Sequence, residues 1–205
     1  MIDKLINAFK LNKEDIVYIF AYGSRVYGNY SNESDYDHII ICKDNTVEND
    51  YALHEGDFSA NLYQESLFDK HVLEHKPYAL ESIFLDDKFV YANKFNLNNF
   101  KLNLAKLRSS FSEKASHSWV KAKKKLEVEK DRDVYIAKKS LFHSLRIIDF
   151  GTQIAKNNKI IDYSSSNFIW YEIKDSKEDH WDYYNNKYKE LFNSRMTEFR
   201  KVAPK

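Results

Sequence analysis

The sequence predicts an α/β (α+β) protein in which a small mixed sheet with helices is followed by an all-helical C-terminal part. Three observations lead to this fold class. Two apolar runs of strand length lie close together near the start, an alternating segment follows, and from about residue 98 onward every strong periodicity is helical. With 205 residues, 43% of them hydrophobic, the chain is long enough for one large domain or two small ones. We therefore expect a sheet-containing region over residues 1–95 and a helical region over residues 96–205.

The strands of the first region are predicted from β-branched and aromatic runs. Residues 16–22 (IVYIFAY) end at Gly23, and residues 37–42 (DHIIIC) form a second apolar run, so these two strands are expected to pair. Residues 57–63 (DFSANLY) alternate apolar and polar side chains, which is the period of a half-buried strand. The polar segment 44–50 between them is expected to be a loop.

The helices are predicted from apolar residues spaced three and four apart. The expected helices of the first region are a short one containing Ile2, Leu5, Ile6 and Phe9, and two more over residues 64–75 and 78–84 that break at Pro77. Those of the second region cover residues 102–126, 134–155 and 181–199, with a polar loop over residues 157–166. The first region is therefore mixed and the second is helical throughout.

Composition and charge limit the classes of function. The 32 Lys and Arg residues against 31 Asp and Glu leave a formal charge of +1, so the overall charge does not indicate a nucleic-acid-binding protein. Cys42, the only cysteine, follows three isoleucines, which predicts a buried small hydrophobe and excludes an internal disulfide. The histidines lack the spacing of a structural zinc site. No apolar run is long enough to span a bilayer, and the opening residues do not resemble a secretion signal, so a cytoplasmic location is expected.

The stretch that is most informative about chemistry joins the first two strands. Gly23-Ser24 follows the first strand, and after 10 intervening residues Asp35-x-Asp37 opens the second. Because positions two apart in a strand point the same way, the carboxylates of Asp35 and Asp37 are expected side by side. Magnesium binds such oxygen ligands and leaves its other positions to water and phosphate. Gly23 permits a tight turn, and Ser24 is expected to begin a helix whose N-terminus faces a triphosphate.

This arrangement resembles the signature of the DNA polymerase β nucleotidyltransferase superfamily, in which Gly-Ser precedes an Asp-x-Asp pair by about this spacing. The motif covers residues 20–42. A weaker similarity, to phage and bacterial nucleotidyltransferases that are sometimes linked to RNA repair, extends to about residue 150. It is carried by Gly23-Ser24-Arg25-x-x-Gly28, by Leu80-Glu81-Ser82-Ile83-Phe84-Leu85 and by Lys139-Ser140-Leu141-Phe142-His143-Ser144-Leu145-Arg146. The alternative is that Asp35 and Asp37 are ordinary turn carboxylates.

The resemblance implies a reaction and a set of site residues. A nucleoside monophosphate would pass from a nucleoside triphosphate such as ATP to a hydroxyl acceptor, with two Mg²⁺ or Mn²⁺ ions held by Asp35 and Asp37. Ser24 and Arg25 would hold the β and γ phosphates. The superfamily adds a third carboxylate on a neighbouring strand, as metal ligand and proton acceptor, and Asp57 at the start of the third predicted strand is the best candidate. The alternative is that Asp57 is merely a turn residue.

Two basic patterns in the second region suggest phosphate contacts. Lys139, His143 and Arg146 are spaced i, i+4 and i+7, so one helix face would present all three to a triphosphate, or else form a solvated charged surface. The lysine-rich segment 121–125 would hold an RNA or DNA backbone, although a run of lysines is also typical of a solvated helix face.

The acceptor follows less directly from the residues. We expect an RNA end, such as that of a tRNA, because of the lysine-rich helix and the similarity to RNA-repair proteins. A protein hydroxyl and a small molecule such as an aminoglycoside are alternative acceptors. A third possibility is a catalytically silent module that binds nucleotides or nucleic acid, because Ser59 and Asn61 occupy the inward positions of the third strand. The sequence indicates neither the base of the triphosphate nor an oligomeric state.

Overall fold

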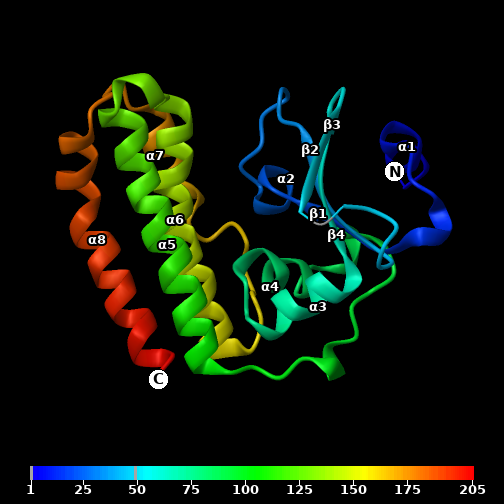
Figure 1. Ribbon diagram of the computed structural model, residues 1–205. Helices are drawn as coiled ribbons and strands as arrows, with labels where there is room; N and C mark the ends of the chain where they lie inside the picture. The colour runs from blue at the N-terminus through cyan, green and yellow to red at the C-terminus, as the bar shows by residue number, and fades with distance from the viewer. Residues whose placement is uncertain (1, 49) are drawn as a thin grey trace. The chain divides into compact units, whose positions relative to one another are not determined.

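The computed structural model describes residues 2–48 and 50–205 (Figure 1). The chain forms two compact units, Met1–Lys101 and Leu102–Lys205. The first unit holds a mixed sheet with helices and the second is helical, so the predicted fold class is confirmed. The first unit ends after Phe100, whose ring packs against those of His75 and Phe84, and the domain boundary at residues 95 and 96 remains a prediction. Among the residues described, no helix has both the length and the apolar character needed to cross a bilayer.

The sheet of the first unit has five strands in the order β3-β4-β2-β1-β5. These are β1 (Ile16–Tyr22), β2 (Tyr36–Cys42), β3 (Tyr51–Glu55), β4 (Phe58–Gln64) and β5 (Val90–Ala92). β2 runs parallel to β4, and the other neighbouring strands are antiparallel. The register places Asp37 between Tyr22 of β1 and Ser59 of β4.

β1, β2 and β4 confirm the strands predicted from the sequence, whereas β3 and β5 were missed. β4 begins at Phe58, so the expectation that Asp57 begins this strand is wrong and Asp57 lies in the turn before it. β3 and β5 are the two edges of the sheet. β3 is largely exposed and β5 has only 3 residues, so neither contains the apolar run by which a central strand is recognised.

One face of the sheet packs against α1 (Ile2–Phe9), the predicted opening helix. The buried residues of this core are Leu5, Phe9, Ile19, Ile40, Cys42, Ala60 and Leu62. Cys42 is therefore the small buried hydrophobe that was predicted. Burial raises the pKa of its thiol to about 11, and the nearby Asp15 carboxylate adds to the rise.

The opposite face packs against the helix α3 (Glu65–Leu73), which is followed by α4 (Pro77–Ile83); both helices were predicted. The ring of Phe68 in α3 lies 5.9 Å from that of Phe20 and 6.2 Å from that of Tyr18, both in β1. α4 is buried over most of its length. A single helical turn, α2 (Ser24–Tyr27), follows β1 directly.

The second unit contains α5 (Leu104–Glu127), α6 (Val134–Asn157), α7 (Asn167–Asp175) and α8 (Trp181–Val202). α5, α6 and α8 were predicted from their periodicity, whereas α7 was not. Gly151 lets α6 approach its neighbours closely, since a Cβ there would lie 2.9 Å from the Phe199 ring of α8 and 3.0 Å from the Phe111 ring of α5. The core of this unit is therefore packed tightly at Gly151.

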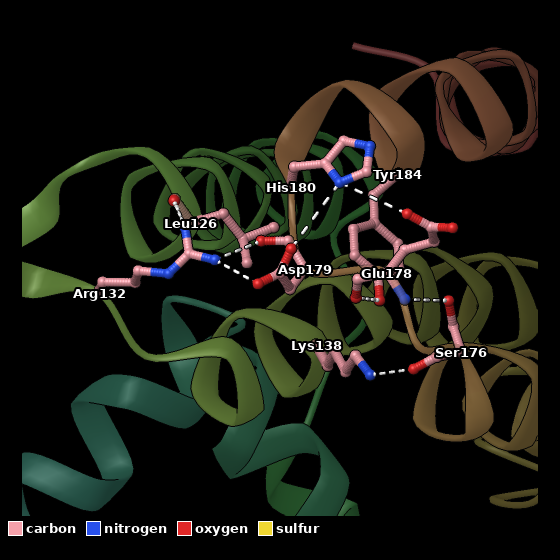
Figure 2. Close-up of polar contacts among 8 residues, drawn as sticks. All are labelled: Leu126, Arg132, Lys138, Ser176, Glu178, Asp179, His180 and Tyr184. Carbon is pink, nitrogen blue, oxygen red and sulfur yellow. Dashed lines mark hydrogen bonds and ion pairs between the residues drawn. The ribbon is translucent and has the colours of Figure 1, made fainter.

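Polar contacts join the connections between the helices of the second unit (Figure 2). Arg132, between α5 and α6, donates to the Leu126 carbonyl at 2.7 Å and to the Asp179 carboxylate at 2.7 Å. Lys138 of α6 donates to the Ser176 carbonyl at 2.6 Å. The segment between α7 and α8 is thus held to α6 and to the preceding connection.

Candidate functional site

The turn between β1 and α2 lies directly against the carboxylate of Asp37. Gly23 has φ 75° and ψ −154°, a conformation that is costly for any residue with a Cβ. A Cβ at Gly23 would lie 2.1 Å from Asp37 Oδ2 and 2.8 Å from its Cγ. Because Gly23 has no side chain, the backbone of this turn can lie directly against the Asp37 carboxylate.

The side chain of Asp37 is oriented from the neighbouring strand. Ser59 Oγ donates a hydrogen bond of 2.5 Å to Asp37 Oδ1, across the parallel pair of β2 and β4. Hydrogen bonds of this kind orient carboxylate ligands in metal sites. The same register places a hydroxyl, rather than a third carboxylate, directly beside Asp37.

Asp35 is exposed and lies one residue before β2, and its backbone is held by Arg25. Arg25 Nε donates to the Asp35 carbonyl at 3.2 Å, and Nη2 donates to the Ser34 carbonyl at 2.6 Å. The guanidinium also lies 3.7 Å from the centre of the Tyr36 ring, within the range of a cation–π contact. These contacts fix the chain that leads into the Asp35-x-Asp37 pair, a role of Arg25 that sequence reasoning missed. Its phosphate contact remains a prediction.

Asp57 is exposed and lies in the turn between β3 and β4. The Asp57 carbonyl accepts a hydrogen bond of 2.8 Å from the Tyr36 amide. Tyr36 of β2 lies opposite Phe58 of β4, and Asp35 and Asp57 are the residues that directly precede them in the chain. Within residues 2–48 and 50–205, no three His, Cys, Asp or Glu side chains form a group that would hold a metal ion. The structure therefore does not bring Asp57 into one cluster with Asp35 and Asp37, and its metal-binding role remains a prediction.

A buried hydrogen bond connects α2 to α4. Ser24 begins α2 as expected, and Tyr27 at its other end donates from its hydroxyl to Glu81 Oε2 at 2.5 Å. Glu81 is 1% exposed and Tyr27 is 3% exposed. The Tyr27 ring also meets the ring of Tyr22, the β1 residue paired with Asp37, edge to face at 6.0 Å. A glutamate within an apolar helix was the one sequence signal for this contact.

The comparisons with known proteins now identify this unit. A family model described as "Polymerase beta, Nucleotidyltransferase" matches residues 3–96, a range that contains the whole sheet and the contact between Gly23 and Asp37. Residues 3–96 belong to the polymerase β-type nucleotidyltransferase superfamily.

The other comparisons found a distantly similar structure and no match among curated proteins. Among solved structures, the chain is similar to a nucleotidyltransferase-like protein from Exiguobacterium sibiricum 255-15 at 11% sequence identity and a TM-score of 0.34, over 98% of this chain and 72% of that one. No curated protein matches the sequence.

Outside the nucleotidyltransferase domain, α6 places Lys139, His143 and Arg146 along one face, with different environments. Lys139 is exposed, whereas Arg146 is 7% exposed and lies over the rings of Phe142 and Phe150 at 5.2 and 5.7 Å. A hydrogen bond of 2.9 Å joins Arg146 Nη2 to His143 Nδ1. A triphosphate contact of these three residues remains a prediction.

The lysines of segment 121–125 differ in their partners. Lys123 pairs with Glu127 at 3.7 Å, and Lys124 and Lys125 pair with Asp131 at 3.7 and 2.6 Å. Lys121 has no ion pair in the part of the chain that the structure describes. Lys121 therefore carries the unpaired positive charge of this segment.

Proposed function

We propose that the protein is a metal-dependent nucleotidyltransferase that moves a nucleoside monophosphate from a nucleoside triphosphate to a hydroxyl acceptor, an RNA end such as that of a tRNA. The observation that carries this proposal is the close approach of Gly23 to Asp37 within a polymerase β-type domain. The positive-φ glycine at this turn leaves room for the Asp37 carboxylate directly against the backbone that begins α2. This arrangement suits an Asp that binds a cation beside a turn to which we assign phosphate contacts.

The residues present fit a bound magnesium or manganese ion. Asp35 and Asp37 supply hard oxygen ligands, and magnesium is commonly bound through one or two carboxylates together with substrate phosphates. Ser59 fixes Asp37 Oδ1, which supports a defined ligand geometry. When bound, such ions would neutralise charge on the triphosphate and lower the pKa of the acceptor hydroxyl.

The remaining steps are assigned to the chain's own residues. Ser24 and Arg25 would orient the β and γ phosphates, so that the acceptor oxygen attacks the α-phosphorus in line with the leaving pyrophosphate. The new bond joins that oxygen to the α-phosphorus, and the bond from the α-phosphorus to the bridging oxygen breaks. Asp57 would accept the proton of the acceptor hydroxyl, from its place in the turn before β4. Lys139 and Arg146 would add positive charge for phosphate oxygens, and His143 would add a ring N–H donor.

A specific observation favours a second candidate function. Ser59 occupies the position beside Asp37 on the parallel strand, and no group of three metal ligands forms among the described residues. Both facts suit a catalytically silent module that binds nucleotides or nucleic acid. A protein hydroxyl or a small molecule such as an aminoglycoside would change the acceptor, not the chemistry of the domain.

The deciding experiment follows a label from the triphosphate. The protein is incubated with each of the four α-labelled triphosphates, with Mg²⁺ or Mn²⁺, and with total cellular RNA and protein. Label in an RNA band supports the proposed acceptor, and label in a protein band moves the acceptor to a polypeptide. A γ-labelled triphosphate serves as the control, since nucleotidyl transfer leaves that label in pyrophosphate. Retention of the triphosphate on the protein without any labelled acceptor would support the binding module.

A further inference from the structure

Basic side chains of α5 and α6 lie near one histidine of the second unit. The α5–α6 cationic cluster consists of Lys114 and Lys121 on α5 with His143 and Arg146 on α6. The two lysines are seven residues apart, so two helical turns bring them to the same side of α5. Burial is the main cause that lowers the pKa of His143, and the positive charges of Arg146, Lys114 and Lys121 lower it further, in that order.

The hydrogen bond to Arg146 defines the state of His143. A guanidinium only donates, so Nδ1 of His143 accepts the 2.9 Å bond and the neutral ring carries its proton on Nε2. Burial, and after it the neighbouring cations, hold the pKa of His143 well below its usual range. The cluster therefore contains a neutral N–H donor flanked by the charges of Lys114 and Lys121.

The two lysines of the cluster are available to a ligand. Both are exposed, and neither forms an ion pair within the described residues. Lys123 and Lys124, further along the same helix, are instead paired with Glu127 and Asp131. Cations brought together without a carboxylate repel one another, and an anion bound among them would relieve this repulsion.

We propose that the α5–α6 cationic cluster binds the phosphate groups of a single nucleic-acid strand. Lys114 and Lys121 supply point charges, His143 Nε2 donates to a phosphate oxygen, and Arg146 is the positioning residue that holds His143 in this tautomer. The lysines are separated by about 10 Å along the helix at a rise of about 1.5 Å per residue, which is too far for one phosphate group and suits two phosphates of the same strand. The inference rests on the proposed function, because an RNA acceptor would present such a strand.

The first test compares two pairs of lysines on the same helix. Lys114→Ala/Lys121→Ala and the control Lys123→Ala/Lys124→Ala remove equal charge, and binding of labelled single-stranded RNA is measured by fluorescence anisotropy at several salt concentrations. The first variant should bind about tenfold more weakly, and its slope of log K against log salt should flatten by about 0.7 for each lost phosphate contact. An equal loss in both variants, or no loss in the first, would overturn the proposal.

The second test observes the histidine directly. The His143 ring resonance, identified by its disappearance in His143→Gln, is followed by NMR through a pH titration with RNA, ATP, inorganic phosphate or chloride at equal ionic strength. A phosphate beside the ring favours the protonated form, so RNA should raise the pKa of His143 while chloride does not. An effect of ATP or inorganic phosphate with none from RNA would assign the site to free phosphates and overturn the nucleic-acid ligand. No effect of any of them would overturn the site.

The two proposals fail in different ways. Asp35→Ala and Asp37→Ala should abolish nucleotidyl transfer while leaving the RNA-induced shift of His143 unchanged. RNA binding through the cluster without label transfer would contradict the proposed function alone. Label transfer to RNA with an unshifted His143 and unchanged affinity in Lys114→Ala/Lys121→Ala would contradict the phosphate site alone.

Discussion

The polar side chains of the two units are used differently. In the first unit they fix the backbone around the candidate ligands, as Arg25 does for Asp35 and Glu81 does for α2. In the second unit they join helices and connections, as Arg132 and Asp179 do in Figure 2. The difference indicates that polar substitutions in the first unit should change activity beyond any change in stability, whereas most of those in the second should change stability alone.

A second network in the helical unit illustrates its structural use of polar groups. Asp149 accepts hydrogen bonds from Ser165 and, at 3.3 Å, from Ser166. Gln153 Oε1 accepts from the amides of Ile161 and Asp162 at 3.0 and 2.9 Å. The connection between α6 and α7 is thereby tied to α6 by both of these side chains. None of these contacts involves a residue to which we assign chemistry.

The largest effect is expected for the carboxylates of the first unit. Asp35→Ala and Asp37→Ala should each lower nucleotidyl transfer by a factor of about 100 or more, because each removes a ligand of the metal ions that support the reaction. Circular dichroism should show an unchanged fold. Equal transfer by either variant and the unaltered protein would contradict the assignment of the pair.

The next largest effect is expected at Gly23, where a pair of variants distinguishes steric contact from backbone strain. Gly23→Ala should lower transfer at least about tenfold and destabilise the first unit by about 1–3 kcal/mol, since its Cβ would meet the Asp37 carboxylate. Gly56→Ala is the matched control, because Gly56 also has positive φ but a Cβ there would meet nothing within 4 Å. Chemical denaturation and label transfer are measured on both. Equal losses of stability in the two variants would show that the contact with Asp37 adds nothing to backbone strain at Gly23.

The buried contact between Tyr27 and Glu81 should affect both stability and activity. Tyr27→Phe removes a donor from a buried carboxylate and should cost about 1–3 kcal/mol of unfolding free energy. Glu81→Gln keeps an acceptor for the Tyr27 hydroxyl and should retain more transfer per folded molecule than Glu81→Leu. Ser165→Ala in the helical unit is the comparison, with a loss of stability and unchanged kcat and KM. If Glu81→Leu behaves like Ser165→Ala, then Glu81 has no positioning role.

Stability should fall on acidification in both units. Burial is the main cause that lowers the pKa of His38 and His71 in the first unit and of His143 in the second, so these rings bind a proton less readily in the folded than in the unfolded chain. Below the ordinary pKa of 6.5 the unfolded chain binds protons that the native rings do not, and the free energy of unfolding decreases as the pH falls. Urea denaturation at several pH values measures this slope. His38→Gln should make it shallower, and an identical slope would contradict the role of His38.

The smallest effect is expected at the connection drawn in Figure 2. Arg132→Ala removes an ion pair whose side chains are 40% and 60% exposed, and such pairs contribute about 0.2–1 kcal/mol. Thermal denaturation should therefore shift slightly, with no change in label transfer. A large loss of transfer at unchanged stability would contradict the division between the two units.

Local periodicity was enough to predict the central strands and the long helices, because burial repeats every two residues in β4 and every three or four in α6. It did not predict β3 and β5, which are held by pairing at the sheet edges, or α7, whose 9 residues follow a polar loop. The candidate site likewise contains one part that local sequence predicts and one part that it does not. Gly23, Asp35 and Asp37 form a local pattern, whereas the contact of Tyr27 with Glu81 joins segments that are distant in sequence and depends on the packing of α4.

The position of β5 has a consequence for the order of folding. β1 pairs on one side with β2, a near neighbour in the sequence, but on the other side Phe20 lies opposite Val90, and Asn93 donates to the Val17 carbonyl. Pairing over such a long separation closes a large loop and slows folding, whereas α5 and α6 pack as consecutive helices. During synthesis the nucleotidyltransferase domain leaves the ribosome before the helical unit. We expect its sheet to stay incomplete until the β5 segment emerges, so that a nascent chain arrested before β5 would remain sensitive to protease.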